Sequence, residues 1–177
     1  LEYLEFVTPA DMQRIKAMEI IPSIRPEVTL TDKLILNETI KPENGQNLGL
    51  WSNLLKQNNI IISGTDFPYH TINPLVVMYY LSSGLAVDTA ANRLTNNIAQ
   101  KLSVLDALKS FTVYSAFASF AEEVKGTLEK DKFADMVVLS DDIVASDPAV
   151  LLKAKILMTI IRGEVVYENK SPGALLY

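Results

Sequence analysis

The residue of this sequence best placed to do chemistry is Asp66, an acid that directly follows a short apolar run. Ile60–Ser63 is typical of a buried strand, and Gly64 and Pro68, on either side of the acid, indicate that the strand ends there. Barrel enzymes place their catalytic groups at such C-terminal strand tips. Asp is also a common cap of helices and turns, so a structural role for Asp66 is the alternative.

Two further side chains could help Asp66 by binding a substrate. His70, the single histidine of the sequence, follows Asp66 by four residues and could face the mouth of a site there. Arg25 could hold a substrate carboxylate with two parallel hydrogen bonds from its planar guanidinium. The alternatives are an ordinary surface or capping role for His70 and a solvated loop position for Arg25.

Composition excludes several classes of protein. Of the 177 residues 49% are hydrophobic, which is enough for a buried core, and the net charge of -5 argues against a nucleic-acid partner. No apolar run reaches the length of a membrane span, and no secretion leader is visible. The absence of cysteine excludes disulfides and thiolate metal sites, so we expect a cytoplasmic protein. With one histidine, a Ser-His-Asp triad could use only His70, and a metal site would need carboxylates.

The order of the predicted elements is that of a parallel α/β protein. Strands are expected at Leu1–Val7, Ile20–Ile24 and Ile60–Ser63, and the chain is therefore expected to begin inside a fold rather than at its edge. The other expected elements are a helix starting at Thr8-Pro9, a polar connection over Arg25–Asn47, and helices over Leu48–Gln57, from Asn73-Pro74 to Gly84, over Val104–Lys109 and from Thr112 through Ala121.

From Val124 onward the pattern changes to that of a small β element. Strands are predicted at Ala134–Leu139, Ile156–Ile161 and Glu164–Tyr167, and Arg162-Gly163 is typical of a hairpin turn. The chain is therefore expected to divide into residues 1–123 and residues 124–177.

Six short motifs follow one another in an order and spacing known from one family. They are Leu1-Glu2-Tyr3, Pro9 through Pro26, Ser63-Gly64-Thr65-Asp66-Phe67-Pro68, Asn73-Pro74-Leu75, Gly126 through Leu139, and Thr159 through Tyr167. Through them nearly the whole chain resembles the C-terminal half of the metal-dependent amidohydrolase superfamily, in the branch called amidohydrolase family 3. The resemblance implies an α/β fold, with the second half of a (β/α)8 TIM-type barrel over residues 1–123 and the C-terminal strands of a composite β-sandwich over residues 124–177.

The resemblance also implies an activity. Family members hydrolyse carbon–nitrogen bonds other than peptide bonds in small-molecule substrates, with one or two divalent metals such as zinc or iron. Asp66 matches the acid that binds the metal and takes a proton from the bound water. The other metal ligands of the family lie upstream of Leu1. The isolated chain is therefore expected to hold no metal of its own and to be inactive.

Four positions depart from the family pattern. Tyr3 stands where the family has a histidine, and a phenol is a poor ligand for a divalent metal at neutral pH. Arg25 stands where glutamine is common, Glu27 where histidine is often found, and Asp131 where a turn glycine is usual. Tyr3 and Glu27 motivate an alternative function, that of a non-catalytic binding or regulatory relative that has lost the metal. Because half a barrel exposes strand edges, a homo-oligomer or another pairing through these edges is expected, with no membrane partner.

Overall fold

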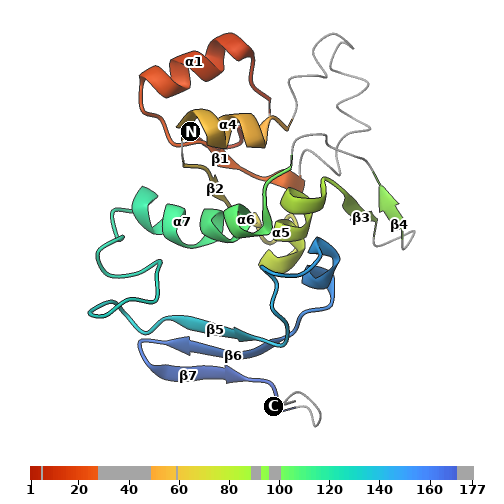
Figure 1. Ribbon diagram of the computed structural model, residues 1–177, viewed down its shortest axis with the longest axis vertical. Coiled ribbons are helices and arrows are strands. Elements are labelled where there is room, and N and C mark those ends of the chain that lie inside the picture. Colours follow the sequence, from red (N-terminus) through yellow and green to blue (C-terminus); the bar gives the residue numbers. More distant parts are fainter. Residues whose placement is uncertain (5, 28–48, 59, 89–92, 96–100, 171–177) are drawn as a thin grey trace.

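Helices and a short parallel strand pair form one part of the molecule, and a three-stranded antiparallel sheet lies at its C-terminal end (Figure 1). The computed structural model describes residues 1–4, 6–27, 49–58, 60–88, 93–95 and 101–170. Within these ranges the predicted α/β class is confirmed. No described helix is long and apolar enough to cross a membrane.

Three backbone segments lie side by side at the N-terminal end of the fold. Strand β1 (Ser23–Ile24) pairs in parallel with β2 (Ile62–Ser63), with Ser23 opposite Ile62. On the other side of β1, the amide of Ser23 donates to the carbonyl of Leu1 at 2.9 Å, and the amide of Leu4 donates to the carbonyl of Ser23 at 3.0 Å. All three segments run in the same direction, so their C-terminal ends meet at one edge.

Two helices lie next to these segments, at the same end of the fold (Figure 1). Helix α1 (Pro9–Ala17) begins as predicted, because the hydroxyl of Thr8 accepts a hydrogen bond from the amide of Asp11 at 3.2 Å. Helix α4 (Trp51–Asn58) packs against α1 and contributes Trp51 and Leu54, both fully buried.

Three further helices follow β2. Helix α5 (Pro74–Ser83) is nearly all apolar and mostly buried, and it ends at Gly84 in the left-handed conformation. Helix α6 (Val104–Phe111) begins at the predicted cap Ser103. Helix α7 (Val113–Ala118) is shorter than the predicted extent through Ala121.

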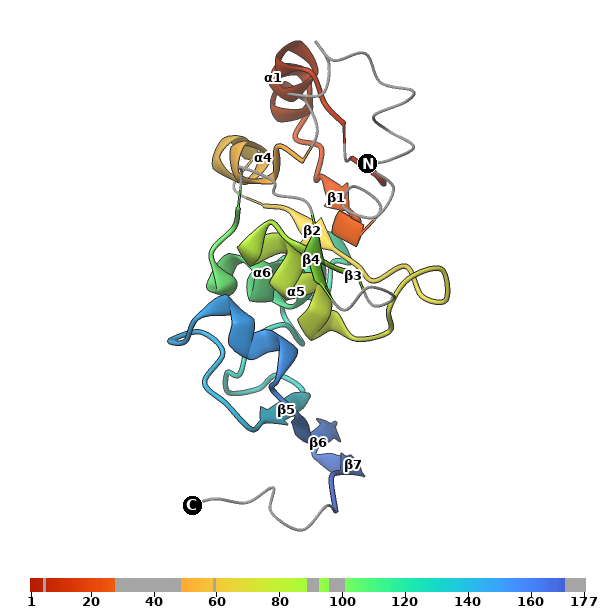
Figure 2. The ribbon, with the colours of Figure 1, turned by 90° about the vertical axis from the view of Figure 1, so that its right-hand side faces the viewer.

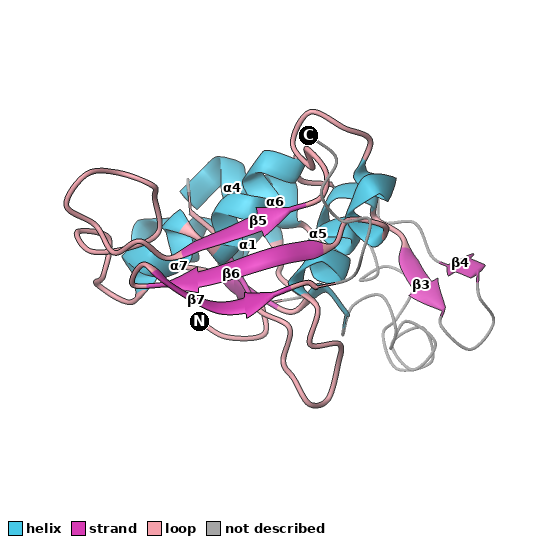
Figure 3. Ribbon diagram, turned by 90° about the horizontal axis from the view of Figure 1, so that it is seen from below, coloured by secondary structure: helices cyan, strands magenta, loops and turns pink. Residues whose placement is uncertain are grey.

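The C-terminal sheet has the order β5 (Met136–Leu139), β6 (Ile156–Ile161), β7 (Glu164–Glu168) and lies across the helices (Figure 3). The β6–β7 turn has positive φ at both central residues, 51° at Arg162 and 82° at Gly163, as a two-residue hairpin requires. The carboxylate of Asp135 supports this turn by accepting the amide of Arg162 at 2.8 Å.

Some elements differ from the sequence expectations. An antiparallel pair, β3 (Ala86–Asp88) with β4 (Arg93–Thr95), and a 3-10 helix, η2 (Pro148–Leu152), were not expected. The predicted polar connection over Arg25–Asn47 lies largely outside the described residues.

Gly126 offers a test of how tightly the C-terminal segment packs on α7. Its φ is +97°, and an added Cβ would lie 2.6 Å from the Cβ of Ala116 and 3.2 Å from the Cα of Val113. We expect Gly126→Ala to lower the free energy of unfolding by about 2–4 kcal/mol, because strain and overpacking add. Urea denaturation followed by circular dichroism measures this.

Gly163→Ala is the matched control for that experiment. Gly163 also has a positive φ, +82°, but nothing lies within 4 Å of its added Cβ. Backbone strain alone then acts, at about 1–2 kcal/mol. Equal losses in the two variants would contradict the proposed close contact between Gly126 and α7.

Candidate active site

Asp66 lies just past the end of β2, at the edge where the three parallel segments end. The loop that it begins projects beyond the helices (Figure 2). The backbone of Asp66 is left-handed, with φ 53°, and its carbonyl accepts the amide of Tyr69 at 3.0 Å. The side chain is half-buried. The predicted position of this carboxylate at a strand tip is therefore confirmed, while its catalytic role stays a prediction.

The hydroxyl of Tyr3 donates a hydrogen bond to Oδ2 of Asp66 over 2.6 Å. Tyr3 also has a left-handed backbone, with φ 56°. Such a conformation costs a residue like tyrosine about 1–2 kcal/mol, whereas Asp adopts it more readily, so the strain in this contact lies at Tyr3. The hydrogen bond to Asp66 is the main reason why the pKa of the Tyr3 phenol is raised above its usual value. Strain of this kind gathers at functional sites.

Arg25 joins the ends of the first two segments. Its Nη1 donates to the hydroxyl of Ser23 and to the carbonyl of Ile24, each over 2.9 Å, and its Nη2 donates to Oε2 of Glu2 over 2.8 Å. The guanidinium also lies 5.7 Å from the centre of the Tyr3 ring, within the range of a cation–π contact. These contacts give Arg25 a structural role. Substrate binding by Arg25 stays a prediction.

Gly64 is required by the same guanidinium. A Cβ at this position would lie 3.0 Å from Cζ of Arg25. The Arg25 side chain cannot move away without loss, because Glu2 and Ser23 hold its far end. The glycine that precedes Asp66 therefore makes room for Arg25 against β2.

Glu27 is a buried acid close to the loop that Asp66 begins. Its side chain is 6% exposed. Burial raises its pKa to about 7, although a hydrogen bond with the backbone of Thr71 acts in the opposite direction. The sequence identified Glu27 only as a departure from a family pattern, and nothing in its neighbours signals burial.

His70 lies in the same loop, directly before Thr71, and is half-buried. Within the described ranges, no hydrogen bond or ion pair joins His70 to Asp66. The structure therefore brings Asp66 together with Tyr3, and Tyr3 with Arg25, but does not add His70 to this group. Its role in binding a substrate stays a prediction.

The donor set around Asp66 does not by itself make a metal site. In the part of the chain that the structure describes, no three His, Cys, Asp or Glu side chains are grouped so that they could hold an ion. Asp66 supplies one carboxylate, and one of its oxygens already accepts the Tyr3 hydroxyl. A divalent metal needs three or more protein ligands in a typical catalytic site.

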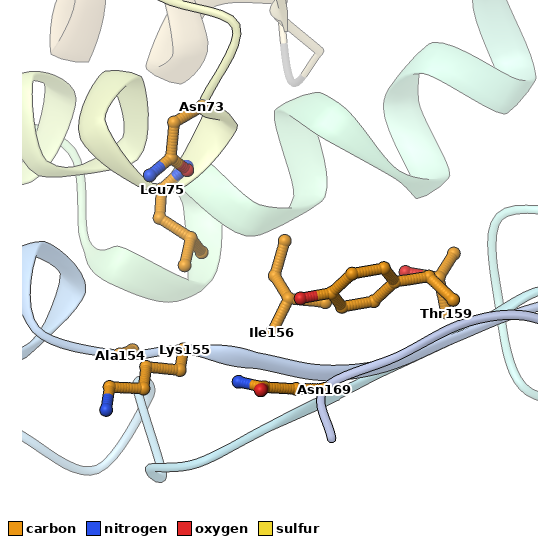
Figure 4. Close-up of a pocket in the computed structure, with 8 residues that line it drawn as sticks. Asn73, Leu75, Ala154, Lys155, Ile156, Thr159 and Asn169 are labelled. Carbon is orange, nitrogen blue, oxygen red and sulfur yellow. The ribbon is translucent and has the colours of Figure 1, made fainter. Parts of the chain in front are cut away.

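A separate groove of about 430 Å³ lies between the start of α5 and the C-terminal sheet (Figure 4). Its lining residues are Asn73, Leu75, Ala154, Lys155, Ile156, Thr159, Tyr167 and Asn169. Asp66, Tyr3 and Arg25 are not among them, so this groove is distinct from the candidate active site.

The buried Glu27 gives a pH-dependent prediction. Its folded pKa of about 7 exceeds the ordinary 4.5, so its contribution to stability is full below pH 4.5 and is lost as the pH rises through 7. Relative to Glu27→Gln, the unmodified chain should lose about 3 kcal/mol of unfolding free energy between pH 4.5 and pH 8. Urea denaturation of both proteins at the two pH values measures the difference.

Glu129→Gln is the control, because a hydrogen bond from Lys132 lowers the pKa of Glu129. The stability that Glu129 contributes is present above its ordinary pKa and is lost as the pH falls. Its pH dependence is therefore opposite in sign to that of Glu27. If the difference in unfolding free energy between the unmodified chain and Glu27→Gln is the same at pH 4.5 and pH 8, the proposed burial of a titrating acid is contradicted.

Comparison with known proteins shows which family this chain resembles. A model of the amidohydrolase family matches residues 1–167. The protein YtcJ of Bacillus subtilis strain 168, named as an amidohydrolase, is 26% identical to this chain over 166 residues. The match covers 89% of this chain and 30% of YtcJ. Protein LONG AFTER FAR-RED 3 of Arabidopsis thaliana is 26% identical over 177 residues, covering 94% of this chain and 28% of its own.

A solved structure shares the fold. It is an uncharacterized metal-dependent hydrolase from Pyrococcus horikoshii, with a TM-score of 0.68 and 22% identity over 84% of this chain and 30% of that one. The chain thus spans less than a third of the length of these three proteins. Because the family match extends over most of its residues, the chain belongs to the amidohydrolase family.

Proposed function

We propose that this chain carries the general base of a hydrolase that cleaves carbon–nitrogen bonds, other than peptide bonds, in small molecules. The observation that carries the proposal is the Asp66 carboxylate, which stands at the tip of β2 and is oriented through Oδ2 by Tyr3. Family membership supports the reaction class.

We propose that residues 1–123 are the second half of a (β/α)8 barrel, and that residues 124–177 are strands of a composite β-sandwich. The three parallel segments and the helices between them support the first assignment. The antiparallel sheet β5–β6–β7 supports the second. In a barrel, the edge that holds Asp66 is the one that carries the active site.

In the proposed reaction Asp66 accepts a proton from a water molecule as the water oxygen bonds to the carbon of the scissile bond. The carbon–nitrogen bond then breaks, and the proton passes from Asp66 to the leaving nitrogen. Oδ1 is the oxygen suited to this transfer, because Oδ2 accepts the Tyr3 hydroxyl. A divalent zinc or iron ion would supply Lewis-acid chemistry in a family enzyme. Its ligands would have to come mainly from outside the described residues.

One observation favours a second function, that of a non-catalytic binding or regulatory relative. Tyr3 stands where the family motif has a histidine, and its hydroxyl donates a hydrogen bond to Oδ2 of Asp66. A protein that had lost its metal would keep the fold and the pocket at this edge while giving up hydrolysis.

We expect residues 1–177 alone to show no metal-dependent amidase turnover, because Asp66 is not grouped with other metal ligands among the described residues. In the whole protein, Asp66→Asn should lower kcat by about 10²- to 10⁴-fold, the usual contribution of a general base. Asp141→Asn, at an exposed position after β5, is the matched control.

Three outcomes would contradict parts of this proposal. Turnover by residues 1–177 that Asp66→Asn abolishes would show that the isolated chain is active after all. Full activity of the whole protein with Asp66→Asn would remove Asp66 as the base. Whole protein that contains no zinc or iron and hydrolyses nothing would favour the non-catalytic alternative.

We also propose that the chain associates with a second copy through exposed sheet edges. All five residues of the edge strand β7 are exposed, and Val165 and Val166 are each more than half exposed. An uncovered apolar edge strand tends to pair with another chain. Light scattering should therefore report a mass above that of one chain, which Val166→Lys lowers. A monomer at high protein concentration would contradict this proposal.

A further inference from the structure

The contact between Tyr3 and Asp66 has a consequence for cation binding at this edge. A divalent cation binds a carboxylate through the lone pairs of its oxygens. The Tyr3 hydroxyl already donates to Oδ2 of Asp66 over 2.6 Å, within the range of hydrogen bonds to ionised carboxylates. A cation at Oδ2 would share this oxygen with the hydroxyl, and the hydroxyl proton draws negative charge away from the carboxylate. The hydrogen bond therefore opposes cation binding at Asp66.

The position of Tyr3 is fixed by the protein itself. Tyr3 has a left-handed backbone. Leu1, before it, and Leu4, after it, both form backbone hydrogen bonds with Ser23 of β1. The Arg25 guanidinium lies 5.7 Å from the centre of the Tyr3 ring and is anchored to Glu2 and Ser23. The hydroxyl is thus held near Asp66 by contacts that involve no ligand.

We propose that the Tyr3 hydroxyl orients the Asp66 carboxylate through Oδ2 and thereby weakens the binding of a divalent cation just past the end of β2. Tyr3 is then a positioning residue. Its hydroxyl bonds to Oδ2, so the two oxygens of the Asp66 carboxylate differ chemically. This inference rests on the proposed function only in taking Asp66 as the functional carboxylate.

Binding of Mn²⁺ to the chain of residues 1–177 tests the proposal without any assay of activity. Mn²⁺ broadens the NMR signals of nearby amides even when it binds weakly, so the amides of Gly64, Thr65 and Asp66 report on this site. Tyr3→Phe removes only the hydroxyl. We expect it to tighten Mn²⁺ binding at this site by about three- to tenfold, the effect of losing one hydrogen bond of typical net strength. Asp66→Asn added to Tyr3→Phe should abolish the gain.

Tyr69→Phe is the matched control. Tyr69 is an exposed tyrosine of the same loop, and no described hydrogen bond joins its hydroxyl to Asp66. It should leave Mn²⁺ binding unchanged. Equal or weaker Mn²⁺ binding by Tyr3→Phe would overturn the proposal, since the hydroxyl would then be irrelevant to the cation or would help to bind it.

The unmodified chain gives a second measurement, which is needed if Tyr3→Phe fails to fold. Asp141 and Asp142 are adjacent exposed acids that follow β5, and they serve as an internal standard in the same spectrum. The amides around Asp66 should broaden at no lower Mn²⁺ concentration than theirs. Selective broadening around Asp66 at a much lower concentration would overturn the proposal. Hydrolysis plays no part in either measurement, so failure of the proposed function and failure of this inference are separately visible.

Discussion

The candidate site depends on the hydrogen bonds that the guanidinium of Arg25 donates. The guanidinium ties the first segment, through Glu2, to β1, through Ser23 and Ile24, and it packs against Gly64, directly after β2. Because all three segments run in parallel, this single side chain sets how their tips are aligned. The placement of Tyr3 beside Asp66 follows from that alignment. Arginine suits this position because its fork of donors can serve several acceptors in one plane.

The sequence predicted well those features that depend on local chemistry. Thr8, Asn73 and Ser103 cap the helices that they were expected to cap, and Gly84 ends α5 in the left-handed conformation. Arg162-Gly163 forms the expected hairpin turn, and Asp131 adopts the left-handed φ of 70° that the replaced glycine would take. Each of these depends on one or two residues and their backbone, so a short pattern is sufficient.

The features that the sequence did not predict depend on contacts between distant segments. The Tyr3–Asp66 hydrogen bond needs a left-handed backbone at both residues, which sequence patterns place mainly at Gly, Asn and Asp. The burial of Glu27 goes against the rule that acids are exposed. The structural role of Arg25 depends on Glu2, an acceptor that only the pairing of segments brings near. Strand β2 is also shorter than the predicted Ile60–Ser63.

The two kinds of strand pairing in this chain differ in the order in which they can assemble. Strands β6 and β7 are joined by a two-residue turn, and a hairpin of this kind forms within microseconds. Strand β1 meets β2 only after a long stretch of chain has been brought back, as the pairing of Ser23 with Ile62 requires. Contacts between residues far apart in sequence slow folding, because the entropy of loop closure must be lost before the contact forms. The pairing of β1 with β2, and with it the edge that bears Asp66, is therefore expected to form after the β6–β7 hairpin.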